Sequence, residues 1–310
     1  MTVEVLIPRD VPLGGLRDMR VRRTLPQRGR SLIGPWCFLD HYGPDDVAET
    51  GGMLVPPHPH TGLQTVSWLF TGAVAHRDSL GTEMVVRPGE LNLMTSGHGI
   101  SHSEVSTGGT TMLHGVQLWL ALPSDAAGNR PAFQHYVPPR VGGAGWQGRV
   151  FMGTAFGNES PVPTYSPTVG AEAVMEAGTT IRPELREGYE CGILVDFGLV
   201  TVNGQEVKPH ELAFVGSVDG LEITAHEGSR VLLVGGAPFG EEIVMWWNFV
   251  GRTHEDIEQA RADWQAQVAT NGPDGLAGAG VQDGRFGVVP GDLGPIPAPE
   301  LPKLRLKPRR

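Results

Sequence analysis

The sequence contains two copies of one short pattern, and this internal repeat limits the folds open to the chain. Residues 57–72 (PHPHTGLQTVSWLFTG) align without a gap with residues 183–198 (PELREGYECGILVDFG), so that one proline and two glycines coincide. Residues 87–94 (RPGELNLM) and 208–215 (KPHELAFV) then share the order Pro-x-Glu-Leu, followed by apolar residues. Two matching blocks in the same order favour duplication of a structural unit over chance.

Each copy reads as a small antiparallel β-structure. An apolar run bounded by glycines predicts a strand, and a turn and a second strand follow it. In the second copy, Asn203-Gly204 is a strong signal for a two-residue hairpin. The chain also holds 44 glycines and 26 prolines, which punctuate many short apolar runs. We therefore expect an all-β protein built from two tandem, jelly-roll-like β-barrels.

The length of 310 residues allows two domains, each with its own core. Residues 142–167 are rich in Gly and Pro and have no sustained periodicity, so we expect the join between the barrels there. This places the N-terminal, metal-binding domain at residues 1–142 and the C-terminal domain at residues 143–270.

One helix and an irregular tail are expected after the second barrel. Thr253 and Asp256 have the spacing of a capping box, which predicts a helix start. Four apolar residues then recur at helical spacing and should face the core: Ile257, Ala260, Trp264 and Val268. Residues 271–310 are Gly- and Pro-rich and should form an irregular tail draped across a domain surface.

Charge and hydropathy exclude several kinds of partner. The formal net charge of −10 argues against direct binding to nucleic acid, which requires a basic surface. No window approaches the roughly 18 apolar residues of a membrane span, so no membrane partner is expected. The first residues, Met-Thr-Val-Glu-Val, lack the basic and apolar order of a secretory signal, and we expect a cytoplasmic protein. Cys37 and Cys191 are too few for a disulfide framework.

Two pairs of side chains suggest a metal site. Residues i and i+2 of a strand point to the same face, as His58 and His60 would, and also His102 and Glu104. If both pairs line one barrel, three imidazoles and one carboxylate converge on one divalent ion, and octahedral geometry leaves two positions for water, dioxygen or substrate. Such ligands suit Fe, Mn, Ni, Cu or Zn and do not choose among them. Pro59 has no N–H, which predicts an edge strand or a strand start.

The second copy has lost every one of these side chains. The positions that match the four candidate ligands hold Glu184, Arg186, Ile223 and Ala225. We therefore expect the C-terminal barrel to bind no metal.

Other residues carry weaker signals. His76 and His114 are interpreted as core residues or as residues behind the ligands. Met94 and Trp119 are interpreted as core or pocket lining. The direction of Gln117 does not follow from strand parity alone.

Three runs together resemble the pirin family of the cupin superfamily. They are HPHTGLQTVSWLFTG, PGELNLMTSGHGISHSE and HGVQLWLAL, and the opening VRRTLPQRGRSLIGPWCFLDHYGP is also similar to the family's N-terminal region. The resemblance covers most of the chain before the tail. It implies a bicupin fold and one metal ion per chain, usually iron as Fe(II). It also implies that the ligands fall on the four candidate residues of the first copy.

The sequence departs from the family pattern at two positions near the candidate site. Where the family commonly has Arg and Glu in HPHRGFETV, this chain has Thr61 and Gln64. General cupins can use a carboxylate near Gln64 as a ligand, which leaves Glu104 as the evident carboxylate here. The loss of a basic group at Thr61 weakens any inference of partner binding from eukaryotic relatives.

The resemblance implies two alternative functions. The first is a quercetin 2,3-dioxygenase, which would act on a flavonol-like substrate and O2, with Glu104 as ligand and possible base for the substrate hydroxyl. The second is a metal- or redox-sensing regulatory protein that acts through protein partners without catalysis. The pocket separates them, because an enzyme needs an open apolar cleft beside a free metal position.

Overall fold

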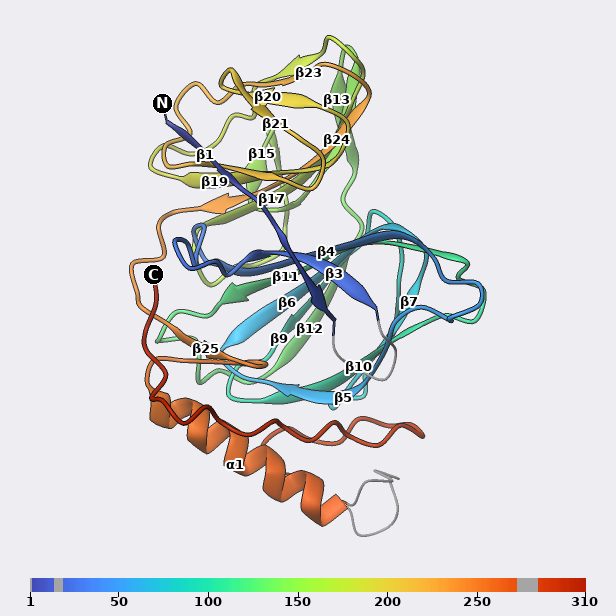
Figure 1. Cartoon of the computed structure of the whole chain (residues 1–310), viewed down its shortest axis with the longest axis vertical. Helices are drawn as coiled ribbons and strands as arrows, with labels where there is room; N and C mark the ends of the chain where they lie inside the picture. The colour runs from blue at the N-terminus through green and yellow to red at the C-terminus, as the bar shows by residue number, and fades with distance from the viewer. Residues whose placement is uncertain (1, 14–18, 272–283) are drawn as a thin grey trace.

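The structure of the protein is a computed structural model that describes residues 2–13, 19–271 and 284–310. Two β-barrels lie one above the other in Figure 1, the C-terminal barrel at the top and the N-terminal barrel below it. The helix α1 (His254–Asn271) lies beneath the N-terminal barrel. The expected all-β architecture with two tandem barrels and one C-terminal helix is therefore confirmed.

The N-terminal barrel consists of a seven-stranded sheet and a four-stranded sheet, both antiparallel. The larger sheet has, in order, β12 (Ala132–Tyr136), β9 (Leu91–Thr95), β6 (Leu63–Thr71), β11 (Met112–Ala121), β4 (Trp36–Asp46), β3 (Arg20–Leu25) and β2 (Arg9–Pro12). The smaller sheet has β5 (Leu54–His60), β10 (Ile100–Ser106), β7 (Val74–Asp78) and β8 (Glu83–Val86).

The C-terminal barrel has the same plan. Its larger sheet has, in order, β1 (Val3–Leu6), β22 (Leu212–Val215), β19 (Glu190–Phe197), β24 (Ser229–Gly236), β17 (Thr168–Met175), β14 (Trp146–Met152) and β13 (Arg140–Gly143). Its smaller sheet has β18 (Thr180–Ile181), β23 (Ile223–Ala225), β20 (Val200–Val202) and β21 (Gln205–Val207). Two hairpins complete the strands: β15 (Thr154–Ala155) with β16 (Asn158–Glu159), and β25 (Val244–Trp246) with β26 (Phe249–Gly251).

The repeat in the sequence corresponds to equivalent strands in the two barrels. β6 and β19 occupy the same place in their sheets, and so do β9 and β22. The glycines that bound the first of these strands, Gly62 and Gly72 in one copy and Gly188 and Gly198 in the other, all have positive φ. Only glycine adopts this conformation without a steric cost, which explains why these positions match.

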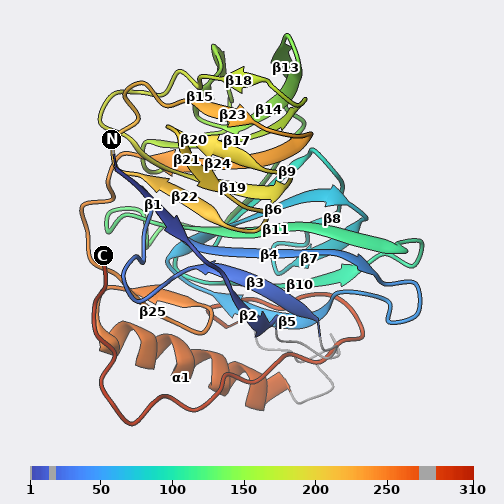
Figure 2. The ribbon, with the colours of Figure 1, turned by 45° about the horizontal axis from the view of Figure 1, so that its top comes forward.

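β1 belongs to the C-terminal barrel although it precedes the N-terminal barrel in the chain (Figure 2). It pairs with β22 at the edge of the larger C-terminal sheet, and β12 has the equivalent edge place beside β9 in the N-terminal barrel. The segment expected to hold the join contains the regular strand β14. Gly148 lies within this strand, and a Cβ at this position would lie 2.2 Å from the carbonyl oxygen of Glu172. This glycine therefore allows two strands to approach closely and does not mark a loop. The boundaries at residues 142 and 270 stay a prediction.

The two larger sheets pack face to face and bury a shared core. Val116, Leu118 and Leu120 of β11 point into this interface. Gln117 and Trp119, which alternate with them, face the inside of the N-terminal barrel. One face of the central strands thus lies in the core shared by the two barrels. The other face lines the interior of the N-terminal barrel, where polar side chains such as Gln117 lie.

The C-terminal helix has the predicted start and the predicted apolar face. The Thr253 hydroxyl accepts a hydrogen bond from the Asp256 N–H (3.1 Å), and the Asp256 carboxylate accepts one from the Thr253 N–H (2.8 Å). Trp264, on the apolar face, is buried. No helix of the described residues is long and apolar enough to cross a membrane.

The tail is irregular from residue 284 to residue 310, as expected, and runs alongside α1 (Figures 1 and 2). It also contacts the sheet that contains β5 and β10, because the N–H of Ser101 donates to the carbonyl oxygen of Phe286 and the N–H of Ile296 donates to that of Pro57. Residues 272–283 of the expected tail lie outside the described residues. The described part therefore covers the outer face of the N-terminal barrel.

Candidate metal centre

Three buried histidines converge inside the N-terminal barrel. His58 and His60 come from β5, which is the edge strand that Pro59 predicts, and His102 lies opposite His58 on β10. Their ring centroids are 4.4 to 5.0 Å apart, and Nε2 of His60 lies 3.0 Å from Nε2 of His102. One nitrogen from each ring lies within 4.8 Å of the other two, so the three side chains can hold a metal ion.

Backbone carbonyls orient two of these rings. Nδ1 of His58 lies 2.9 Å from the carbonyl oxygen of Pro56, and Nδ1 of His60 lies 3.2 Å from that of Asn248. A carbonyl oxygen only accepts, so each Nδ1 carries the proton and each Nε2 keeps its lone pair. This is the arrangement that proteins use to present imidazole to a metal.

A relay of side chains orients the third ring. His76 Nε2 lies 3.3 Å from the Asp78 carboxylate, and His76 Nδ1 lies 3.3 Å from Nδ1 of His102. Since the carboxylate accepts the proton on Nε2 of His76, Nδ1 of His76 can accept from His102, which leaves Nε2 of His102 unprotonated. His76 thus lies behind the candidate ligand His102.

The Asp78 carboxylate is kept charged by its surroundings. Burial opposes the charge, but hydrogen bonds with His76 and with the N–H of Thr82 outweigh it and hold the pKa of Asp78 below its usual value. A charged Asp78 is the acceptor that the relay to His102 needs.

Burial also keeps the three converging imidazoles neutral. It lowers the pKa of His58 to about 4. It lowers the pKa of His60 and of His102 well below the usual value, and neighbouring imidazoles add to the effect. Because a metal binds the neutral form, these rings need no deprotonation near neutral pH.

Glu104 lies beside the three histidines. Burial raises the pKa of its carboxyl, and Ser67 Oγ lies 3.1 Å from its Oε1 and 2.9 Å from Oε1 of Gln117. The strand is irregular here, because the register between β10 and β5 shifts between His102 and Glu104. The donor atoms that lie within 4.8 Å of one another belong to the histidines, so ligation by Glu104 stays a prediction.

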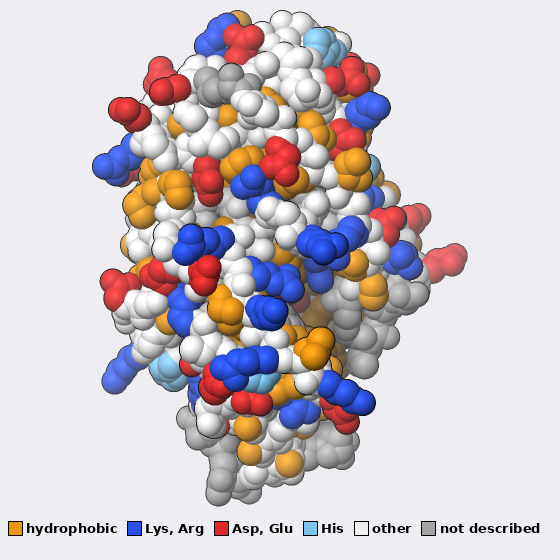
Figure 3. All heavy atoms as spheres, turned by 60° about the vertical axis from the view of Figure 1, so that its left-hand side comes forward, with side chains coloured by type: hydrophobic (Ala, Val, Ile, Leu, Met, Phe, Trp, Pro, Cys, Tyr) orange, Lys and Arg blue, Asp and Glu red, His pale blue; other side chains and the backbone are white. Residues whose placement is uncertain are grey.

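An open cavity of about 630 Å³ leads to this group. His58, His60 and Glu104 lie in its wall, and four aromatic side chains also line it: Phe38, Trp119, Trp246 and Trp247. The rings of Phe38 and Trp119 are stacked with centroids 3.9 Å apart. A hollow of this kind, bordered by Lys, Arg and hydrophobic side chains, is visible on the face drawn in Figure 3. Trp119 is thus pocket lining, whereas Met94 is buried in the core.

The equivalent positions in the second barrel do not bring together a matching group of ligand atoms. Ile223 and Ala225 are fully buried in its apolar core, and Glu184 and Arg186 are exposed after β18. That the second barrel binds no metal stays a prediction, and the side chains at these four positions support it.

A second histidine cluster lies between the two barrels, and sequence reasoning did not find it. Nε2 of His41 and Nε2 of His114 lie 2.8 and 2.6 Å from the same oxygen of Asp196, and the other oxygen pairs with Arg230 at 3.1 Å. The donor atoms are close enough to hold a metal, but Arg230 already neutralises the carboxylate. No sequence pattern could reveal the cluster, because packing of the domains brings its members together.

Sequence reasoning also missed Asp78, Pro56 and Asn248. His76 and Asp78 have the i, i+2 spacing of a ligand pair on β7, so Asp78 had a usable signal. Pro56 and Asn248 act through backbone oxygens, which leave no signal in a sequence.

The three-histidine group predicts the metal content of variants. We expect His102→Ala to lower metal affinity by more than about 100-fold, because loss of residues that merely orient ligands already costs 10- to 100-fold. Iron per chain after anaerobic loading and gel filtration measures this. His98→Ala, at an exposed histidine, is the matched control and should keep one ion per chain.

Glu104→Gln tests the fourth ligand in the same assay. If Glu104 coordinates the metal, loss of its charge should weaken binding against a competing chelator by about tenfold or more. Affinity equal to that of the unmodified protein would show that Glu104 is not a ligand.

The cluster between the barrels predicts a pH dependence of stability. Burial is the main cause that lowers the pKa of His41 in the folded protein, although Asp196 opposes the shift. Below the ordinary histidine pKa of about 6.5, the unfolded chain therefore binds a proton that the folded chain does not, and stability falls as the pH falls.

Urea unfolding of the metal-free protein between pH 7.5 and 5 measures this effect. His41→Gln keeps a donor for Asp196 but cannot titrate. Below pH 6.5 we expect the free energy of unfolding of this variant to fall less steeply than that of the unmodified protein. The two slopes should differ by up to about 1.4 kcal/mol per pH unit. Parallel pH profiles of the two proteins would contradict the assignment.

Comparison with known proteins identifies the family. The sequence signature of Pirin matches residues 18–120, and that of the Pirin C-terminal cupin domain matches residues 170–270. A Pseudomonas aeruginosa protein named "Putative quercetin 2,3-dioxygenase" is 41% identical over 297 residues, which is 95% of this chain and 89% of that protein. Human Pirin is 30% identical over 256 residues, which is 79% of this chain and 86% of that protein.

A solved structure agrees. The crystal structure of quercetin 2,3-dioxygenase from Acinetobacter baumannii is 36% identical, with a TM-score of 0.86 over 98% of this chain and 97% of that chain. The chain therefore belongs to the pirin family and has its bicupin fold, with an N-terminal pirin domain and a C-terminal pirin cupin domain.

Proposed function

We propose that the protein is an Fe(II)-dependent dioxygenase that cleaves a flavonol-like substrate with O2, in the manner of a quercetin 2,3-dioxygenase. The observation that carries the proposal is the set of three buried imidazoles, two of which lie in the wall of an open cavity with aromatic sides. The names of relatives that are 36% and 41% identical support the same reaction.

The residues present fit a metal ion. Three neutral imidazoles offer Nε2 lone pairs, and each ring is held by a partner on its Nδ1. Imidazole, with or without a carboxylate, suits Fe(II), and Mn, Ni, Cu and Zn accept the same donors, so we propose iron on the family resemblance. A bound divalent ion would lower the pKa of a substrate hydroxyl and orient the substrate for reaction with O2.

Glu104 is proposed as the base that accepts the hydroxyl proton. Its raised pKa makes the carboxylate a stronger base than an exposed glutamate, and it lines the same cavity as His58 and His60. Ser67, 3.1 Å from Oε1, can hold this carboxylate in one orientation. The side chain would therefore take up the proton where the substrate meets the histidines.

Aromatic side chains are proposed to hold the flat rings of the substrate. Phe38 and Trp119 form one stacked pair in the cavity wall, and Trp246 and Trp247 line it as well.

The cavity favours an enzyme over the regulatory alternative. A space of about 630 Å³ is within the range of sites for small molecules, and it reaches the ligand group itself. A regulator that acts through protein partners without catalysis has no need of such a space.

Oxygen uptake tests the proposal. Anaerobically iron-loaded protein, given quercetin and then O2, should consume one O2 and release one CO for each flavonol cleaved, as measured with an oxygen electrode and a CO assay. His102→Ala should show neither. Glu104→Gln, with its iron content measured, should be slower by about 10²- to 10⁴-fold if it has lost the base.

If protein with one iron per chain consumes no O2 in the presence of quercetin, the flavonol dioxygenase proposal is wrong. The regulatory role, with protein partners, would then be the leading function.

A further inference from the structure

The C-terminal tail forms part of the wall of the metal cavity. Ile296, Pro297, Pro299 and Arg309 line it together with His58 and His60. Residues more than 200 positions apart in the sequence therefore enclose one space. The tail is a structural part of the candidate site.

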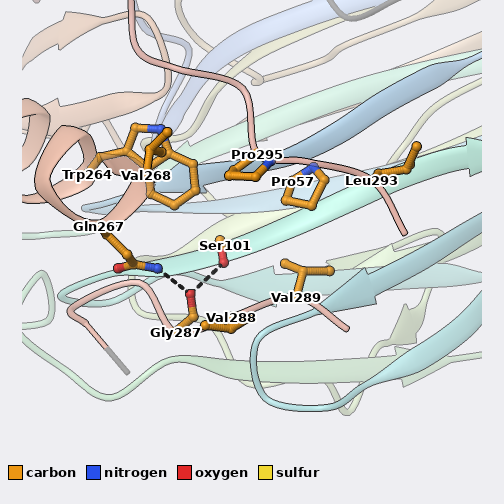
Figure 4. Close-up of a pocket in the computed structure, with 10 residues that line it drawn as sticks. All are labelled: Pro57, Ser101, Trp264, Gln267, Val268, Gly287, Val288, Val289, Leu293 and Pro295. Carbon is orange, nitrogen blue, oxygen red and sulfur yellow. Dashed lines mark hydrogen bonds between the residues drawn. The ribbon is translucent and has the colours of Figure 1, made fainter. Parts of the chain in front are cut away.

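Hydrogen bonds fix the tail at Gly287 and again at Ile296. Figure 4 shows Ser101 of β10 and Gln267 of α1 directed at the carbonyl oxygen of Gly287, at 3.2 and 2.5 Å. The space enclosed there is only about 20 Å³, which is room for one water and no ligand. Further along, the N–H of Ile296 donates to the carbonyl oxygen of Pro57 at 2.8 Å.

The last residues are held in the same way. Backbone hydrogen bonds join Arg309 and Ile243 in both directions, at 2.8 and 2.9 Å. The main chain at Arg309 is thus fixed, and its side chain lies at the cavity lining. Because the main chain is fixed at both places, the cavity wall that it forms is preorganised.

Three arginines of the described residues line this cavity, and they differ in what they already bind. Arg23 makes two hydrogen bonds of 2.7 Å to the Asp40 carboxylate, so its charge is compensated. Arg9 donates to the neutral carbonyl oxygen of Pro26 at 2.9 Å, and its charge acts only at a distance on Asp40. Arg309 makes no side-chain hydrogen bond or ion pair with the described residues. Arg9 and Arg309 are therefore cations without a directly paired anion in the part of the chain that the structure describes.

The cavity is positive although the protein is negative. Among the described residues, its lining holds three arginines against two carboxylates, Asp40 and Glu104, which is a formal excess of one positive charge. The whole chain carries −10. A divalent ion on the histidines would add two more positive charges. A positive cleft on an acidic protein concentrates anions and repels cations.

We propose that the preferred substrate is a hydroxylated planar aromatic compound with an anionic group, such as a carboxylate, at the end away from the metal, and that Arg9 and Arg309 bind this group. The inference rests on the proposed function, because it takes the cavity beside the three histidines to be the substrate site. A flavonol with an acidic substituent on its far ring has this chemistry. Its hydroxyl would face the histidines, its rings the aromatic walls, and its anion the two guanidinium groups, whose N–H forks match a carboxylate.

A matched pair of ligands tests the charge requirement. The probes are 3-hydroxyflavone with a 4′-carboxylate and the methyl ester of the same compound, which differ in charge but little in shape. Binding to metal-loaded protein is measured without O2, by tryptophan fluorescence quenching, so that no turnover is needed. We expect the acid to bind about tenfold or more tightly than the ester at low salt, with a smaller ratio at high salt.

Variants assign the preference to the two arginines. Arg9→Gln combined with Arg309→Gln should bring the acid and the ester to within about twofold of each other, because the charge-assisted hydrogen bonds are lost. Arg87→Gln removes one exposed arginine that does not line the cavity and should keep the full ratio.

Equal binding of the acid and the ester by the unmodified protein would overturn the inference, and so would a ratio that survives in the double variant. Either result is independent of oxygen uptake. If the acid is preferred but no O2 is consumed, the flavonol dioxygenase proposal fails and the anion-binding inference stands.

Discussion

The hydrogen bond between Nδ1 of His60 and the carbonyl oxygen of Asn248 joins the hairpin that follows the C-terminal barrel to the candidate metal site. Asn248 lies in the turn between β25 and β26, so this hairpin must return to the N-terminal barrel before His60 is oriented. The N–H of Val250 donates to the carbonyl oxygen of Thr61 at 3.0 Å and fixes that return. At Gly62, any Cβ would lie 2.2 Å from the carbonyl oxygen of Val250, so the approach requires a residue without one. The geometry of the candidate ligands in the N-terminal barrel thus depends on a segment that follows the C-terminal barrel.

Features that depend on local periodicity could be predicted from the sequence. The i, i+2 spacing places His58 and His60 on one face of β5, and the capping residues start α1 where the spacing indicates. The glycines of the repeat mark the same turns in both barrels because each needs positive φ. These features are fixed by the residue and its near neighbours, so a pattern is enough to find them.

Features made by long-range packing could not be predicted in this way. The acceptor at Asn248 is a backbone carbonyl oxygen, which every residue has. The type of residue at position 248 therefore gives no signal in the sequence. His41 and Asp196 meet only because two barrels pack together. In the sequence, Arg309 is one of several basic residues near residue 310, and only the fold shows that it lines the cavity. The candidate ligands were therefore accessible from the sequence, while the residues that orient them and shape the cavity were mostly not.

The place of β1 in the C-terminal barrel has a consequence for how the chain can be made and divided. β1 precedes its partner β22 by more than 200 residues, so β1 stays unpaired during synthesis until β22 has been made. An open sheet edge is a surface on which other chains can pair. A cut between the two halves would separate β1 from its sheet and leave that edge exposed. The two barrels look like separable modules, but the C-terminal half of the chain completes its larger sheet only in the presence of the N-terminal half.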